Sequence, residues 1–207
     1  MSAFEFFFSF YGLLLGLSVA ELVGGLSRVL HERQRVRFGW LTPLLALFVA
    51  MDVATFWSQA WTIFRGAPFN LALLFVGLVV AATFYIAASV TFPRVTAEGV
   101  EERIDLDDHF WAHRRLIFSC ILAANLIVVT IFISLMLADA SFATLSSPRL
   151  WIGFVVFSLG AAAAAFAPRR FASCALILLV TYSLFNVARS AGVLLGDGGW
   201  SLPAPGA

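Results

Sequence analysis

Six apolar stretches of about 20 residues each dominate this sequence, and they constrain the fold more than any other feature. The stretches span residues 6–30, 40–64, 69–92, 115–138, 150–167 and 171–195. A helix needs about 20 apolar residues to cross the roughly 30 Å of hydrocarbon in a bilayer. Because hydrophobic residues make up 61% of the chain and charged residues only 12%, well away from the balance of a soluble domain, the sequence predicts an all-α, polytopic membrane protein. We expect one six-helix transmembrane domain over residues 1–195 and a disordered, Gly- and Pro-rich tail over 196–207.

Arginines gather in alternate loops, and this distribution predicts the orientation of the chain. Ten of the 13 basic residues follow the first, third and fifth stretches or precede the next one. Short loops rich in basic residues stay in the cytoplasm, so we expect both termini on the extracytoplasmic side and loop 93–114 in the cytoplasm. The basic residues are all arginine, which is typical of GC-rich bacterial genes. We therefore expect the inner, or plasma, membrane of a bacterium.

Small residues recur at every fourth position of the first stretch, at Gly12, Gly16, Ala20 and Gly24. Residues at this spacing share one face of a helix, and small side chains let a second helix approach closely. The pattern predicts a packing seam, and it also offers a surface through which copies of the chain associate as a homo-oligomer.

Ionisable and polar residues occur inside the apolar stretches, where they are costly and usually face the interior of a bundle. Glu21 lies beside the small-residue seam, and Asp52 lies near the middle of the second stretch with Gln59 on the same face. Depths estimated at about 1.5 Å per residue predict a polar column in which Arg189 reaches towards Asp52. The column comprises Glu21, Asp52, Gln59, Tyr85, Asn125, Tyr182, Asn186 and Arg189. A direct pair between Glu21 and Arg28 is not expected, because roughly 10 Å of helix rise separates them.

Three interpretations of this column stay open. The polar groups hold the helices in register through hydrogen bonds, or they line a path, or one charge lies at an interface because a helix has been misassigned. The leading hypothesis is a small transporter or channel that moves a proton, an ion or a small polar solute through the column. The alternative is a non-catalytic membrane subunit or sensor that docks a cytoplasmic protein through loop 93–114, the longest charged segment between the stretches.

The end of that loop carries His109 and His113, which are four residues apart and so share a helix face beside Asp105 and Asp107. Two imidazoles at this spacing are weak candidates for a metal site, and an interfacial helix with Asp105 or Asp107 as its N-cap is the favoured explanation. We expect neither a resident metal nor another cofactor, because the chain has no lysine for a Schiff base and no histidine in a predicted span for haem. With no nucleophile and base at usable spacing, we do not expect an enzyme, although chemistry on a lipid or quinone stays open. The net charge of +1 argues against nucleic acid as a partner and leaves the lipid bilayer as the main one.

Overall fold

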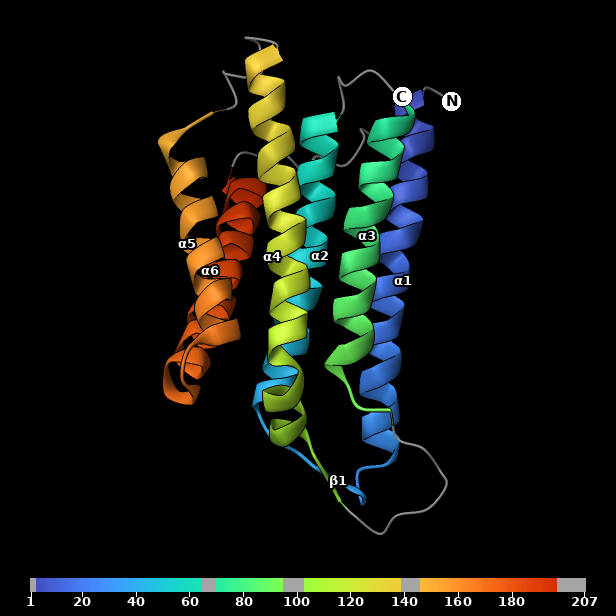
Figure 1. Ribbon diagram of the computed structural model, residues 1–207, viewed down its shortest axis with the longest axis vertical. Coiled ribbons are helices and arrows are strands. Elements are labelled where there is room, and N and C mark those ends of the chain that lie inside the picture. The colour runs from blue at the N-terminus through green and yellow to red at the C-terminus, as the bar shows by residue number, and fades with distance from the viewer. Residues whose placement is uncertain (1–2, 65–69, 95–102, 139–145, 197–207) are drawn as a thin grey trace.

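The computed structural model describes residues 3–64, 70–94, 103–138 and 146–196, and six helices account for most of them (Figure 1). The helices are α1 (Ala3–His31), α2 (Leu41–Phe64), α3 (Leu71–Thr91), α4 (Leu106–Ala138), α5 (Pro148–Phe166) and α6 (Arg169–Gly196). All six are long and apolar enough to cross a membrane. The prediction of an all-helical chain with six helices long and apolar enough to span a membrane is thereby confirmed, whereas membrane insertion and the orientation of the termini stay predictions.

Helix α4 begins at Leu106, nine residues before the predicted span 115–138, as expected for an N-cap at Asp105 or Asp107 whose helix runs into that span. The second half of the predicted loop 93–114 is therefore helical. Asp105 explains this start, because its Oδ1 accepts hydrogen bonds from the backbone N–H groups of Asp107, at 2.8 Å, and Asp108, at 3.4 Å. A side chain that accepts from the first turn in this way is an N-cap, as the sequence predicted for Asp105 or Asp107.

Two short strands join the connections at this end of the bundle, and the sequence did not predict them. Strands β1 (Val36–Arg37) and β2 (Ile104–Asp105) pair in parallel. Below the bundle in Figure 1, they tie the segment after α1 to the segment before α4. A small buried cluster of Val29, Val36, Phe92 and Leu106 supports them.

The start of α4 also caps the start of α2. The backbone N–H of Leu41, the first residue of α2, donates to Asp107 Oδ1 at 3.0 Å, and the Thr42 hydroxyl donates to the Leu106 carbonyl at 2.6 Å. The N–H groups of a first helical turn have no partner within their own helix. The carboxylate of Asp107 on α4 therefore acts as the N-cap of α2.

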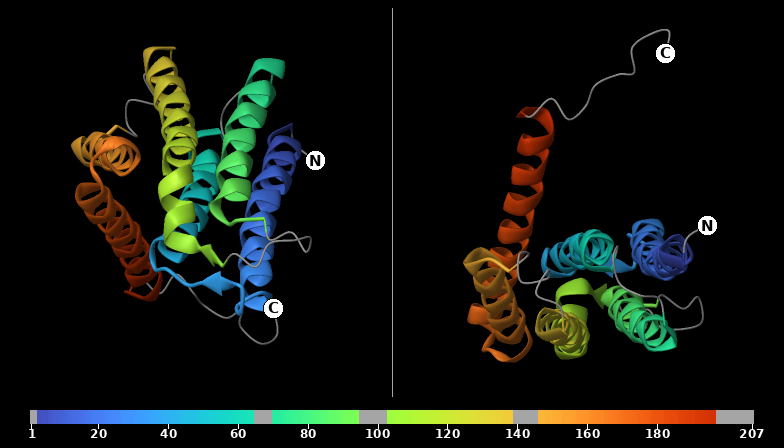
Figure 2. Two further views of the ribbon diagram at one scale, coloured as in Figure 1. Left: turned by 60° about the horizontal axis from the view of Figure 1, so that its bottom comes forward. Right: turned by 90° about the horizontal axis from the view of Figure 1, so that it is seen from above.

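The first four helices pack side by side, and α5 and α6 lie at one side of them (Figure 2). Helix α1 packs against α3 and α2, α4 packs against α3 and α5, and α6 packs against α5 and α2. Seen along the long axis, α6 runs at a steep angle away from the other helices. Its side chains from Thr181 to Gly192 are accordingly almost all exposed, while the N-terminal half buries Ala172, Leu176 and Leu179. Of the predicted tail 196–207, Gly196 ends α6 and the remainder lies outside the described residues.

Candidate functional site

Asp52 is the most deeply buried acidic side chain of the described chain, with 7% of its surface exposed. It lies on α2 one helical turn from Phe48 on one side and from Phe56 on the other. Phe48 contacts Phe118 of α4, with ring centroids 5.8 Å apart, and Phe56 contacts Phe84 of α3 at 4.6 Å. Asp52 thus occupies a layer between two aromatic contacts. Its Oδ2 atom is buried and has no hydrogen-bond partner among the described residues.

Asn125 of α4 faces the same layer. It follows Phe118 by two helical turns and so shares its face, which is the face that meets α2 at Phe48. Helices α2 and α4 run in the same direction, so Asp52 lies about 6 Å and Asn125 about 10 Å beyond the contact between the two phenylalanines. Asn125 is 6% exposed, and its Oδ1 atom also has no partner in the described chain.

Ser18 of α1 completes the layer. A methyl group at Gly12 would lie 3.1 Å from the Trp57 ring, so these two residues lie near each other on the antiparallel helices α1 and α2. Counted from that contact at about 1.5 Å per residue, Ser18 lies about 9 Å further along α1 and Asp52 about 7.5 Å back along α2, which puts them at similar levels. Ser18 is fully buried, and its Oγ is the third buried side-chain oxygen of the described residues without a partner.

We call Ser18, Asp52 and Asn125 the buried polar layer. Its members come from α1, α2 and α4, and each presents an oxygen whose hydrogen bonding is unsatisfied. Tyr11 of α1, which is also buried, lies within electrostatic range of Asp52. Buried polar atoms are nearly always hydrogen-bonded in native proteins, so three unpartnered oxygens at neighbouring levels call for an explanation.

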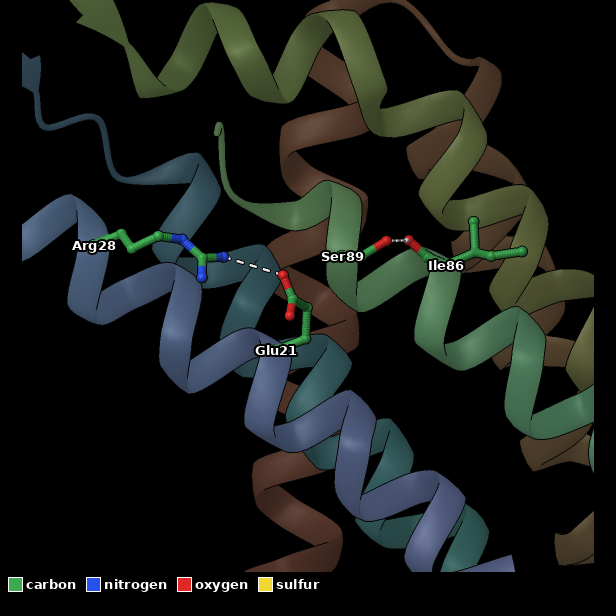
Figure 3. Close-up of polar contacts among 4 residues, drawn as sticks. All are labelled: Glu21, Arg28, Ile86 and Ser89. Carbon is green, nitrogen blue, oxygen red and sulfur yellow. Dashed lines mark hydrogen bonds and ion pairs between the residues drawn. The ribbon is translucent and has the colours of Figure 1, made fainter. Parts of the chain in front are cut away.

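Glu21 is not part of this layer. Its Oε1 accepts from Arg28 Nη2 at 3.0 Å (Figure 3), so the prediction that these two residues are too far apart is wrong. Helical side chains lean towards the N-terminus, and the long arginine side chain therefore covers the two turns back to Glu21. The pair is partly open, with 46% of the Arg28 side chain and 28% of the Glu21 side chain exposed. Ser89 of the neighbouring α3 lies nearby in Figure 3, but its hydroxyl donates to the Ile86 carbonyl of its own helix.

The α6 members of the predicted column, Tyr182, Asn186 and Arg189, do not contact Asp52. Arg189 is exposed in the C-terminal half of α6, a helix that leans away from the bundle (Figure 2), and no ion pair joins it to an acid among the described residues. Asn186 donates to the Tyr182 carbonyl of its own helix, and Tyr182 is 38% exposed. The expected pairing of Arg189 with Asp52 is therefore not formed, because the depth estimate assumed that all six helices run parallel. Gln59 is half-buried two turns above Asp52, and Tyr85 is 44% exposed.

The small-residue face of α1 packs against another helix only in part. Gly12 meets the Trp57 ring, but a Cβ at Gly16 would meet nothing within 4 Å, and Ala20 is exposed. Gly24 meets only Arg28 of its own helix. The closest approach on α1 occurs at Gly25, where a Cβ would lie 2.8 Å from the Phe92 ring. Self-association through the open part of this face stays a prediction.

His109 and His113 each form a hydrogen bond between one ring nitrogen and a backbone carbonyl oxygen. His109 Nε2 lies 2.9 Å from the Val90 carbonyl oxygen at the end of α3, and His113 Nδ1 lies 3.0 Å from the His109 carbonyl oxygen. The described residues contain no group of three or more histidine, cysteine and acidic side chains that could hold a metal ion. Together with the capping by Asp105 and Asp107, these bonds fold the described part of segment 93–114 onto the bundle. Docking of a partner on this segment stays a prediction.

Arg114 is a buried residue whose structural role the sequence analysis missed. Its Nη1 donates to the Ala164 carbonyl at 3.0 Å and its Nη2 to the Ala167 carbonyl at 2.9 Å, at the end of α5. In the sequence it stands only as one of the arginines that predict the topology. The sequence did contain a signal for this residue, because the pair Arg114 and Arg115 follows Trp111 closely and comes just before an apolar stretch.

Comparison of the chain with protein-family models, with curated proteins and with solved structures finds no significant match.

Proposed function

We propose that this protein is a small multi-pass transporter or channel, and that the buried polar layer binds its substrate, a proton or a small cation. The observation that carries the proposal is the set of three buried, unpartnered oxygens on three different helices. An ionisable residue inside a membrane bundle is costly and commonly marks an ion or proton pathway.

The chemistry of the layer favours a positive substrate. Its unpartnered atoms are a carboxylate, an amide and a hydroxyl oxygen, which are ligands that hard cations prefer. Asp52 is the only charged member, so a single positive charge would balance the layer.

A purely structural role fits Asp52 less well than it fits Glu21. Polar groups that hold helices together do so through hydrogen bonds between partners. Glu21 has such a partner in Arg28, whereas Asp52 Oδ2 has none among the described residues. We therefore assign the substrate-binding carboxylate to Asp52 and a local structural role to Glu21.

We further propose that the end carrying the starts of α2, α4 and α6 faces the cytoplasm of a bacterium. The end of α1 and the starts of α4 and α6, which lie at this end in Figure 1, carry Arg28, Arg114 and Arg169, and short loops rich in arginine favour the cytoplasm. Reconstitution in liposomes with a known orientation would test this part separately.

The direct test is flux into proteoliposomes that contain a fluorescent reporter for protons, Na⁺ or K⁺. We expect the wild type to conduct at least one of these cations and Asp52→Asn, which keeps the shape but removes the charge, to lose the flux. Thr55→Val is the matched control, because this exposed hydroxyl on α2 donates to the Met51 carbonyl of its own helix and should be dispensable. Equal flux in the wild type and Asp52→Asn, or no cation flux in the wild type, would refute the proposal.

A further inference from the structure

A cluster of four arginines lies where the start of α4 meets the turn between α5 and α6. Arg114 and Arg115 come from α4, and Arg169 and Arg170 begin α6. Trp111 lies against both pairs, with the Arg114 guanidinium carbon 5.0 Å and the Arg169 guanidinium carbon 5.3 Å from its ring centroid. The two pairs are 55 residues apart in the sequence, and one arginine of each pair lies against the same tryptophan.

No carboxylate neutralises this cluster in the part of the chain that the structure describes. The ion pairs there involve Arg28, Arg35 and Arg37, and none involves the four arginines. Between His109 and Gly196 the sequence has a single acid, Asp139, which follows the opposite end of α4. Asp108 is the nearest acid along α4, about 9 Å of helix rise from Arg114.

The positive charges also act on one another. Arg115 and Arg169 both lie within electrostatic range of Arg114, whose hydrogen bonds go to neutral carbonyls. The start of α6 adds the partial positive charge of a helix N-terminus, and the preceding Pro168 has no side-chain acceptor to cap it. Like charges held together at a membrane surface, with no acid between them, favour a bound anion.

The surroundings favour a lipid as the source of that anion. Arg115, Arg169 and Arg170 are exposed, so a phosphate at the surface can reach all three, including Arg169 where it lies over the Trp111 ring. The residues that follow the two pairs, Leu116 and Phe171, are 49% and 69% exposed and offer an apolar surface to acyl chains. Guanidinium groups bind phosphate oxygens in a bidentate manner, and basic groups between helices at a membrane surface bind anionic headgroups.

We propose that the cluster of Arg114, Arg115, Arg169 and Arg170 around Trp111 binds the phosphate headgroup of an anionic phospholipid. Arg114 holds the end of α5 in place through its two carbonyl bonds, while the three exposed arginines contact the headgroup. The site is separate from the buried polar layer and does not depend on the transport proposal.

The test uses the full chain in neutral detergent, titrated with phosphatidylglycerol while native mass spectrometry counts the bound lipids. We expect Arg169→Gln/Arg170→Gln to weaken binding of the first lipid by about 25-fold, because each arginine near an anionic surface contributes about fivefold. The matched control is Arg33→Gln/Arg94→Gln, which removes the same charge from exposed arginines at the same end. It should change the affinity by less than about twofold, as exposed charges remote from a site usually do.

Two further arms identify the ligand. Phosphatidylcholine should not displace the bound lipid, and millimolar inorganic phosphate alone should neither bind tightly nor compete. The proposal is overturned if both double variants weaken binding alike, since that would indicate diffuse charge attraction, or if inorganic phosphate displaces the lipid. Thermal unfolding in detergent verifies that the double variant is folded, and Arg115→Gln is the replacement should it not be.

Discussion

Replacing Asp52 with valine should stabilise the protein while it abolishes transport. The substitution removes a carboxyl group that is 7% exposed and has an unpartnered oxygen, and it keeps a branched side chain of similar size. A buried polar atom without a partner costs about 1–3 kcal/mol, and the valine removes this cost. We therefore expect the free energy of unfolding to rise by about 2 kcal/mol.

The assay is equilibrium unfolding in mixed micelles, in which SDS displaces a mild detergent and circular dichroism reports the remaining helix. Thr55→Val, which removes an exposed hydroxyl from the same helix, should stay within about 0.5 kcal/mol of the wild type. A loss of 1 kcal/mol or more for Asp52→Val would refute the reasoning. It would mean that the carboxylate holds helices together through a partner, and that the structural interpretation of the polar residues is correct.

Three other substitutions test separate parts of the account. Arg114→Gln should lower the free energy of unfolding by about 3 kcal/mol, since two charge-assisted hydrogen bonds are lost. Its control, Arg115→Gln, should have little effect. Limited proteolysis of the turn between α5 and α6 provides a second measurement. Gly25→Ala should destabilise by about 1–3 kcal/mol because the new methyl group meets an aromatic ring at 2.8 Å, while Gly16→Ala, in open space, should be neutral or stabilising by about 0.5 kcal/mol. Glu21→Gln should retain cation flux and, in a double-mutant cycle with its arginine partner, give a coupling energy below about 1 kcal/mol.

The spans were predictable from the sequence because hydrocarbon thickness sets the length of an apolar helix. Residue-level signals also sufficed for the helix start at Asp105, where a capping acid precedes further acids in the first turn. Both features depend only on residues that are close together in the sequence. They can therefore be predicted from a short stretch of sequence without knowledge of the fold.

What the sequence could not provide is the angle between helices. The predicted pairing of Arg189 with Asp52 assumed parallel helices, but α6 leaves the bundle and takes Arg189 with it (Figure 2). The length and lean of an arginine side chain were also underestimated, so the pair between Glu21 and Arg28 was missed. Contacts such as Arg114 to the end of α5 join residues 50 or more positions apart, and no local pattern specifies them.

The central claim is that Asp52, rather than Glu21, is the unpaired carboxyl at which the transported cation binds. The most direct measurement is labelling of the reconstituted protein with a hydrophobic carbodiimide, which modifies carboxyl groups within the bilayer, followed by mass spectrometry of the peptides. We predict that Asp52 is labelled, that the transported cation slows this labelling at the concentrations that saturate flux, and that any labelling of Glu21 does not respond to the cation. Protection of Glu21 instead of Asp52, or labelling of Asp52 that no conducted cation slows, would contradict the account.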